Sequence, residues 1–223
     1  MGRSRATEGP AIDDLPQRRD ALLVLDVDEV VLHFVQPFRD ILAEHGAGLR
    51  FESFALTGNV RSLSTGAAIT GHEISGITEA LYAEQEARQS VVKGAHEALA
   101  ALSDIADIVF LTAMTPVHHA ARRRLLDREG LTFPMIATER SKGAVVAELG
   151  QRWTGPVVFV DDLPQNLDGV RRSLERTRLV HMMADEELRP HLPRLPRGAH
   201  SARDWKEAAP LLASLLGGGE KPA

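Results

Sequence analysis

The sequence contains no cysteine, which excludes disulfide bonds, thiolate metal sites and cysteine catalysis. No apolar run approaches the roughly 20 residues that a membrane-spanning helix needs, and residues 1–20 lack the apolar core of a secretory signal. The net charge of −5 gives no basic excess of the kind that marks a nucleic-acid-binding protein. We therefore expect a cytoplasmic protein without a nucleic-acid or membrane partner, and nothing in the sequence indicates its oligomeric state.

Two nucleotide-binding signatures are also missing. No Gly-x-Gly-x-x-Gly follows the first apolar run, and no Walker phosphate-binding loop occurs anywhere in the chain. These absences disfavour a dinucleotide-dependent enzyme and a P-loop nucleotide hydrolase.

What the sequence does contain is a regular alternation of short apolar runs and helical patterns, with 43% hydrophobic residues overall. The apolar runs predict strands buried on both faces: Ala21–Leu25, Asp107–Leu111, Phe133–Ala137, Pro156–Val160 and Arg178–Met182. Helices are predicted over Gly94–Ser103, Pro116–Glu129, Ser141–Gly150, Pro164–Glu175 and Ala202–Leu216. The pattern predicts an α/β fold with a Rossmann-like parallel sheet of about five strands and helices on both faces.

The first two predicted strands are separated by about 80 residues, far more than a simple crossover needs. Helical patterns over 37–46 and 74–88 flank a segment rich in Gly, Ser and Thr, so we expect a small, mainly helical cap inserted after the first strand. The expected organisation is a flexible leader (1–19), a core in two parts (20–34 and 89–216), the cap (35–88) and a flexible tail (217–223).

Polar side chains stand where the predicted strands end, which is where open parallel sheets bind their ligands. They are Asp26 and Asp28 after the first strand, Thr112 after the second, Lys142 at the start of the helix after the third, and Asp161 and Asp162 after the fourth.

These residue types suit phosphoryl transfer. Several carboxylates at one edge repel each other, and Mg²⁺ is the natural neutraliser because it prefers oxygen ligands and tolerates a phosphate oxygen among them. A carboxylate can attack phosphorus, and a second carboxyl group can act as general acid and then base. Lys142 and the Thr112 hydroxyl could stabilise the charge on the phosphoryl oxygens.

In this order and at these positions, the residues resemble the four motifs of the haloacid dehalogenase-like superfamily, over nearly the whole chain from Ala21 to about Leu216. The resemblance implies that Asp26 is the nucleophile and a metal ligand, and that Asp28 is the general acid/base with its backbone carbonyl on the metal. It implies that Thr112 and Lys142 position the phosphate. Asp162 resembles the direct Mg²⁺ ligand of the fourth motif, with Asp161 a ligand or a partner of one.

Within that superfamily, Asp28 favours a phosphatase over a dehalogenase, and the cap resembles the helical C1 type. The implied activity is a Mg²⁺-dependent phosphatase that hydrolyses a small phosphorylated metabolite. The segments Asp26–Phe34 and Thr112–Pro116 are faintly similar to small deoxynucleotidases, although Glu29 replaces their usual glycine. A 5'(3')-nucleotidase-like enzyme and a non-catalytic, phosphate-binding or phospho-accepting protein are the alternatives.

Several assignments stay open at the level of sequence. Arg140 competes with Lys142 as the cation on the phosphate side, and Asp161 competes with Asp162 as the direct metal ligand. Asn166 stands where many members of the superfamily carry a further acid, so its role is undetermined.

Other polar and aromatic residues have simpler interpretations. Glu29 could line the entry to the site, and His118 and His119 are interpreted as surface-helix histidines. The Arg122–Arg124 run is interpreted as the solvated face of an amphipathic helix. Tyr82 and the aromatic residues nearby are expected to form the small core of the cap.

Overall fold

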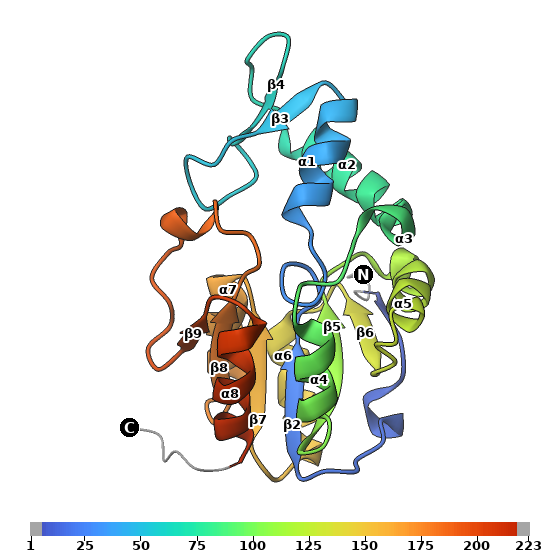
Figure 1. Cartoon of the computed structure of the whole chain (residues 1–223), viewed down its shortest axis with the longest axis vertical. Helices are drawn as coiled ribbons and strands as arrows, with labels where there is room; N and C mark the ends of the chain where they lie inside the picture. Colours follow the sequence, from blue (N-terminus) through green and yellow to red (C-terminus); the bar gives the residue numbers. More distant parts are fainter. Residues whose placement is uncertain (1–5, 218–223) are drawn as a thin grey trace, which may run out of the picture.

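The computed structural model describes residues 6–217, and its centre is a seven-stranded sheet in the order β1-β6-β5-β2-β7-β8-β9. All neighbouring strands in it are parallel except β1, which pairs antiparallel with β6 (Figure 1). The strands are β1 (Thr7–Glu8), β2 (Ala21–Leu25), β5 (Ala106–Thr112), β6 (Met135–Thr138), β7 (Val157–Asp161), β8 (Arg178–Met182) and β9 (His200–Ala202). The predicted α/β fold with a parallel sheet is confirmed, with two edge strands more than the five expected.

Helices follow most of the strands. They are α1 (Val35–Glu44), α2 (Gly71–Ala83), α3 (Gln85–Arg88), α4 (Ala95–Leu102), α5 (His119–Arg128), α6 (Lys142–Arg152), α7 (Pro164–Ser173) and α8 (Trp205–Leu216), with short 3-10 turns at Ile12–Asp14, Pro116–His118 and Arg189–His191. Side-chain caps fix several helix starts: Ser141 accepts from the Ala144 N–H at 3.3 Å and Asp204 from the Glu207 N–H at 3.0 Å. None of the helices in the described part of the chain is long and apolar enough to cross a membrane.

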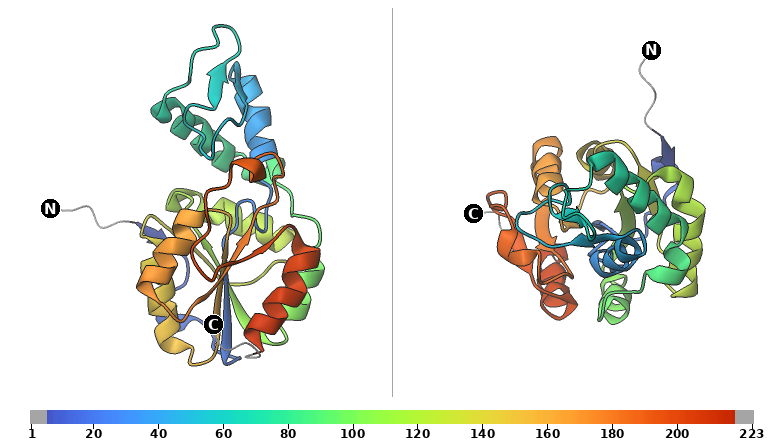
Figure 2. Two further views of the ribbon diagram at one scale, coloured as in Figure 1. Left: turned by 90° about the vertical axis from the view of Figure 1, so that its left-hand side faces the viewer. Right: turned by 90° about the horizontal axis from the view of Figure 1, so that it is seen from above.

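Helices cover both faces of the sheet, as Figure 2 shows in its left-hand view. Because successive side chains of a strand point to opposite faces, Leu23 and Leu25 of β2 pack towards α4, α5 and α8, whereas Leu22 and Val24 pack towards α6 and α7. Strand β2 lies at the centre of the sheet, so both faces of it are buried.

The chain between β2 and α4 forms a separate layer beyond the carboxyl ends of the strands (Figure 1). It contains α1, α2, α3 and a two-stranded antiparallel hairpin of β3 (Ala47–Leu49) and β4 (Val60–Ser62). It has its own apolar cluster, in which Phe38 and Leu81 are fully buried. The expected small insertion after the first strand is therefore present, with a hairpin that the sequence patterns did not predict.

Residues 6–19, expected as part of a leader, contact the core of the fold. Strand β1 extends the sheet at the edge of β6, and the side chain of Leu15 is buried against the α6 side of the core. Arg152 of α6 holds this segment by donating to the Leu15 carbonyl at 2.9 Å. The apolar side chains are too sparse here to give a strand pattern, which is why the segment appears unstructured in the sequence. Residues 1–5 and 218–223 of the predicted leader and tail lie outside the described residues.

Candidate active site

The predicted site residues converge at the carboxyl edge of the sheet. Asp26 directly follows β2, Thr112 ends β5, Asp161 ends β7 and Lys142 opens α6. Since β5, β2 and β7 are adjacent in the sheet, these four side chains come from neighbouring elements.

Lys142 stands between two carboxylates. Its Nζ lies 2.7 Å from Asp26 Oδ1 and 2.7 Å from Asp161 Oδ2, and all three side chains are buried. The competing cation Arg140 pairs instead with Glu148 on α6. The structure therefore brings Lys142, and not Arg140, to the carboxylates.

Burial of these charged groups shifts their pKa values. Burial raises the pKa of Asp26 to about 7, against the opposing effect of Lys142 and with further repulsion from Asp161 and Asp28. Burial also raises the pKa of Asp162 well above its usual value, helped by repulsion from Asp161 and Asp26. For Lys142, burial lowers the pKa, but the attraction of Asp161 and Asp26 outweighs this and the net pKa is raised.

A divalent cation fits this donor set. Asp26, Asp161 and Asp162 each offer a carboxylate oxygen, and these three oxygens lie within 4.8 Å of one another. Within residues 6–217, Lys142 is the one ion-pair partner of this triad, so a single positive charge faces three acids. A hard cation with oxygen ligands, such as Mg²⁺, would supply the missing positive charge.

Neighbouring groups hold the triad in place. Asp161 Oδ1 accepts from the Leu163 N–H and from Asn166 Nδ2, both at 2.9 Å, so Asn166 orients Asp161. The Asp162 carbonyl lies 2.9 Å from Nε2 of the buried His181 on β8. Thr112 is also buried, and its Oγ1 accepts from the Met114 N–H at 3.1 Å.

Asp28 has a different set of partners. Its Oδ1 lies 3.0 Å from Arg122 Nη2 and accepts from Gln89 Nε2 at 2.9 Å. Its Oδ2 accepts a long hydrogen bond of 3.4 Å from the Tyr82 hydroxyl. Tyr82, at the end of α2, therefore faces the site, and its assignment to the core of the cap was wrong.

The interpretation of Arg122 as part of a solvated helix face was also wrong, because its side chain is 0% exposed. Arg122 lies three and four residues before Leu125 and Leu126, which are the other buried residues of α5. Helical periodicity therefore places all three side chains on the inner face, and this spacing was the available signal. Gln85 and Gln89, which contact Arg122, carried no comparable signal.

Glu29 braces the start of the insertion, and it is also one of the residues that line a neighbouring groove. Its buried carboxylate accepts from the backbone N–H groups of Phe34, Val35 and Asp185, each at 2.7 Å. Burial raises the pKa of this carboxyl group, against the three hydrogen bonds. The backbone of Glu29 has a φ of 61°, a left-handed conformation that costs a non-glycine residue about 1 kcal/mol. The three hydrogen bonds offset that strain.

Neither His118 nor His119 is an exposed surface residue, because both side chains are half-buried. His118 Nε2 lies 2.7 Å from Glu79 Oε2 of α2, and Glu79 Oε1 accepts from Thr115 Oγ1 at 2.5 Å. Glu79 thus ties the insertion to the core. His119 lies 3.2 Å from the Met135 carbonyl and takes no part in the site.

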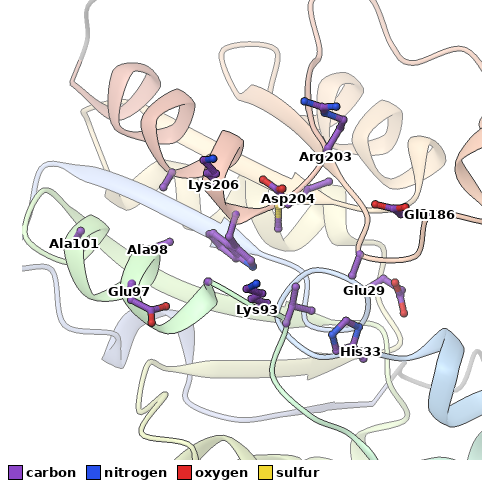
Figure 3. A pocket seen from close by; sticks show the side chains of 16 residues that line it. Glu29, His33, Lys93, Glu97, Ala98, Ala101, Glu186, Arg203, Asp204 and Lys206 are labelled. Atoms are coloured by element: carbon purple, nitrogen blue, oxygen red, sulfur yellow. The ribbon is translucent and has the colours of Figure 1, made fainter.

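A groove of about 730 Å³ lies between α4 and the start of α8 and does not include the triad. Figure 3 shows its labelled side chains: Lys93 and Glu97 come from the α4 side, Asp204 and Lys206 from the start of α8. Its lining includes both acidic and basic groups, so its charge favours no particular class of ligand.

Comparisons with known proteins agree with this geometry at the level of the fold. No model of a known family matches the sequence, and no curated protein matches it. The structure is similar to a conserved haloacid dehalogenase-like protein of unknown function from Agrobacterium tumefaciens, at a TM-score of 0.60 and 14% identity over 88% of this chain and 98% of that chain.

Two further solved structures are similar. A haloacid dehalogenase (HAD) family hydrolase from Deinococcus radiodurans with bound phosphate and sodium has a TM-score of 0.56 and 14% identity, over 91% of this chain and 98% of that chain. A putative β-phosphoglucomutase from Thermotoga maritima has a TM-score of 0.55 and 14% identity, over 87% and 99%. The chain therefore has the haloacid dehalogenase-like α/β fold, as the resemblance of its motifs implied.

Proposed function

We propose that this protein is a Mg²⁺-dependent phosphatase that hydrolyses a small phosphorylated metabolite. The observation that carries the proposal is the buried triad of Asp26, Asp161 and Asp162 with Lys142 between two of its members. The phosphate bound in the Deinococcus radiodurans hydrolase of the same fold supports a phosphate-ester substrate.

In the first step, a carboxylate oxygen of Asp26 attacks phosphorus and the bond from phosphorus to the ester oxygen breaks. Asp28 gives its proton to that leaving oxygen, and an aspartyl phosphate remains on Asp26. Lys142 and Thr112 stabilise the negative charge on the phosphoryl oxygens. Asp26, Asp162, Asp161 and the Asp28 backbone carbonyl would hold Mg²⁺, which would supply positive charge to neutralise the acids and the phosphate.

In the second step, water attacks the phosphorus of the aspartyl phosphate while Asp28 accepts a proton from it. The bond from phosphorus to the Asp26 oxygen breaks, inorganic phosphate leaves and the Asp26 carboxylate is restored. The raised pKa of Asp26 means that its ionised form, which the attack requires, depends on the nearby positive charge of Lys142 and the cation.

The test is release of phosphate from 4-nitrophenyl phosphate and from a panel of phosphorylated metabolites, with Mg²⁺ and with EDTA. Activity should require Mg²⁺ and should disappear in Asp26→Asn, whereas Asp168→Asn, which changes an exposed carboxylate on α7, should match the wild type. Unchanged turnover in Asp26→Asn would rule out the aspartyl nucleophile. A stable phosphoprotein without turnover would instead identify a phospho-accepting protein.

A further inference from the structure

The side chain of Arg122 is the one guanidinium within residues 6–217 that forms an ion pair with Asp28. It is 0% exposed, although an arginine is rarely buried without a specific partner. Its Nη2 lies 3.0 Å from Asp28 Oδ1 and donates to Gln89 Oε1 at 2.9 Å, and its Nε donates to Gln85 Oε1. The rigid, planar guanidinium therefore contacts three side chains at once.

Gln89 connects this cluster to the base of the insertion. Its amide nitrogen donates to Asp28 Oδ1 and to the His33 carbonyl, both at 2.9 Å. The His33 N–H in turn donates to the Ser90 carbonyl at 2.9 Å. His33 and Ser90 lie on the two segments by which the chain enters and leaves the insertion, so Asp28 is fixed relative to both.

The two oxygens of Asp28 are consequently unequal. Oδ1 is held by Arg122 and Gln89, whereas the partner of Oδ2 among the described residues is the Tyr82 hydroxyl at 3.4 Å. The Arg122 guanidinium carbon also lies 5.6 Å from the centre of the Tyr82 ring, which places a cation beside that aromatic face. An oxygen with one long hydrogen bond is the one able to exchange a proton with a substrate.

We propose that Arg122 is a positioning residue that immobilises Oδ1 of Asp28 and thereby presents Oδ2 to the leaving group. This inference rests on the proposed phosphatase function. Arg122 does not touch the substrate in this role. It acts through Asp28, so its loss should weaken protonation of the leaving group and leave the attack by Asp26 intact.

The experiment compares kcat/KM for 4-nitrophenyl phosphate, whose leaving group needs little protonation, with kcat/KM for phenyl phosphate, whose leaving group needs more. The full chain is assayed with Mg²⁺ as wild type, Arg122→Met and Asp28→Asn. We expect Arg122→Met to lower kcat/KM about tenfold more for phenyl phosphate than for 4-nitrophenyl phosphate, in the same direction as Asp28→Asn. A merely structural role would lower both values by the same factor, and that result would overturn the inference.

Two further variants separate the direct effect from general damage. Arg124→Met removes an arginine of the same helix that pairs with Glu86 of α3 at 2.6 Å and is 63% exposed. In this variant the ratio of the two kcat/KM values should stay at the wild-type value. In a protein that already carries Asp28→Asn, adding Arg122→Met should change kcat/KM less than about threefold. The reason is that the two substitutions disrupt the same interaction, the one between Arg122 and Asp28. A further loss as large as that in the wild-type background would contradict the inference.

If Arg122→Met does not fold, as its melting temperature would show, Gln89→Met provides the same test. It removes one of the two donors to Oδ1 and leaves Arg122 in place, so we expect a smaller shift of the ratio in the same direction. An unchanged ratio in Gln89→Met would then overturn the inference. Wild-type protein that releases no phosphate from either ester would refute the proposed function itself, whereas turnover with equal losses refutes the role of Arg122 alone.

Discussion

Asp26 and Asp28 are two residues apart, but they lie in different environments. The partners of Asp26 belong to the core: its N–H donates to Val160 of β7, and its carboxylate pairs with Lys142 of α6. The side-chain partners of Asp28 are Arg122 of α5, Gln89 at the base of the insertion and Tyr82 of α2. The proposed nucleophile is thus fixed by the sheet and its helices, and the proposed acid/base is fixed by the junction between core and insertion.

Because their partners differ, the positions of Asp26 and Asp28 depend on different parts of the chain. The core alone determines where the proposed metal ligands and the proposed nucleophile lie, because Asp26, Asp161 and Asp162 stand at the carboxyl ends of β2 and β7. The position of Asp28, the proposed proton donor, depends in addition on how the insertion is attached. Changes in the insertion should therefore alter leaving-group protonation and substrate binding before they alter nucleophilic attack.

We expect the largest effects on turnover from substitution of Asp26 and Asp28 themselves. Asp26→Asn should lower kcat by about a thousandfold or more and should form no phosphoprotein. Asp28→Asn should still be phosphorylated by 4-nitrophenyl phosphate and should accumulate the phosphorylated form, because hydrolysis of the intermediate needs the base. Mass spectrometry of protein quenched during turnover measures both, and a phosphorylated Asp26→Asn protein would contradict the assignment.

The next largest effect should be a loss of stability on removal of the Lys142 ammonium group. Lys142→Met leaves Asp26 and Asp161 buried without their partner and should lower the free energy of unfolding by about 3–5 kcal/mol without divalent cations. Arg140→Met removes a partly exposed ion pair with Glu148 and should cost less than about 1 kcal/mol. Urea denaturation in EDTA measures both changes, and equal costs would show that Lys142 does not stabilise the triad.

The free energy of unfolding should depend on pH by about 1 kcal/mol or more because of Asp26, whose pKa is raised from 3.8 to about 7. Between these values the folded protein binds a proton that the unfolded chain has lost. The free energy of unfolding in EDTA should therefore fall as the pH rises from about 4 to about 7.

The same measurement provides its own controls. Asp26→Asn should flatten this decline, whereas Asp168→Asn should retain it. Stabilisation by Mg²⁺ should be greater above pH 7 than at pH 5, because the cation and the proton compete for the carboxylate. A decline of equal slope in Asp26→Asn would show that other groups cause it.

The smallest effect should come from the link between insertion and core at Glu79. Glu79→Gln weakens the contacts with His118 and Thr115 and should raise KM about two- to fivefold, with a loss of stability below about 1 kcal/mol. Glu84→Gln, which changes an acid paired with Arg88 inside the insertion, should leave KM unchanged. Steady-state kinetics with 4-nitrophenyl phosphate distinguishes the two variants.

The sequence predicted the core better than it predicted the insertion, for physical reasons. Strands buried on both faces are continuous apolar runs, so β2 and β8 match their expected bounds, and the ends of such strands locate Asp26, Thr112 and Asp161. Strand β1 has two exposed residues and is held by pairing with β6, which leaves no apolar pattern in the sequence.

The partners of Asp28 could not be predicted in the same way. Gln89 and Tyr82 are distant from Asp28 in sequence, and the folded chain brings them to it by the path of the insertion. Arg122 was recoverable from its spacing to Leu125 and Leu126, but three consecutive arginines favoured a surface interpretation. The sequence shows which charged residues a helix contains, whereas tertiary packing determines which of them is buried.

The hydrogen bond from the His33 N–H to the Ser90 carbonyl has an evolutionary consequence. It brings the two ends of the insertion together, so the segment between them is a loop closed at its base. Loop closure costs little more for a longer loop than for a shorter one, about 0.6 kcal/mol for each doubling of length. Insertions of other lengths and folds could therefore be exchanged at this point without disturbing the β2–β5 pairing, which would allow substrate range to diverge while the proposed catalytic edge is inherited unchanged.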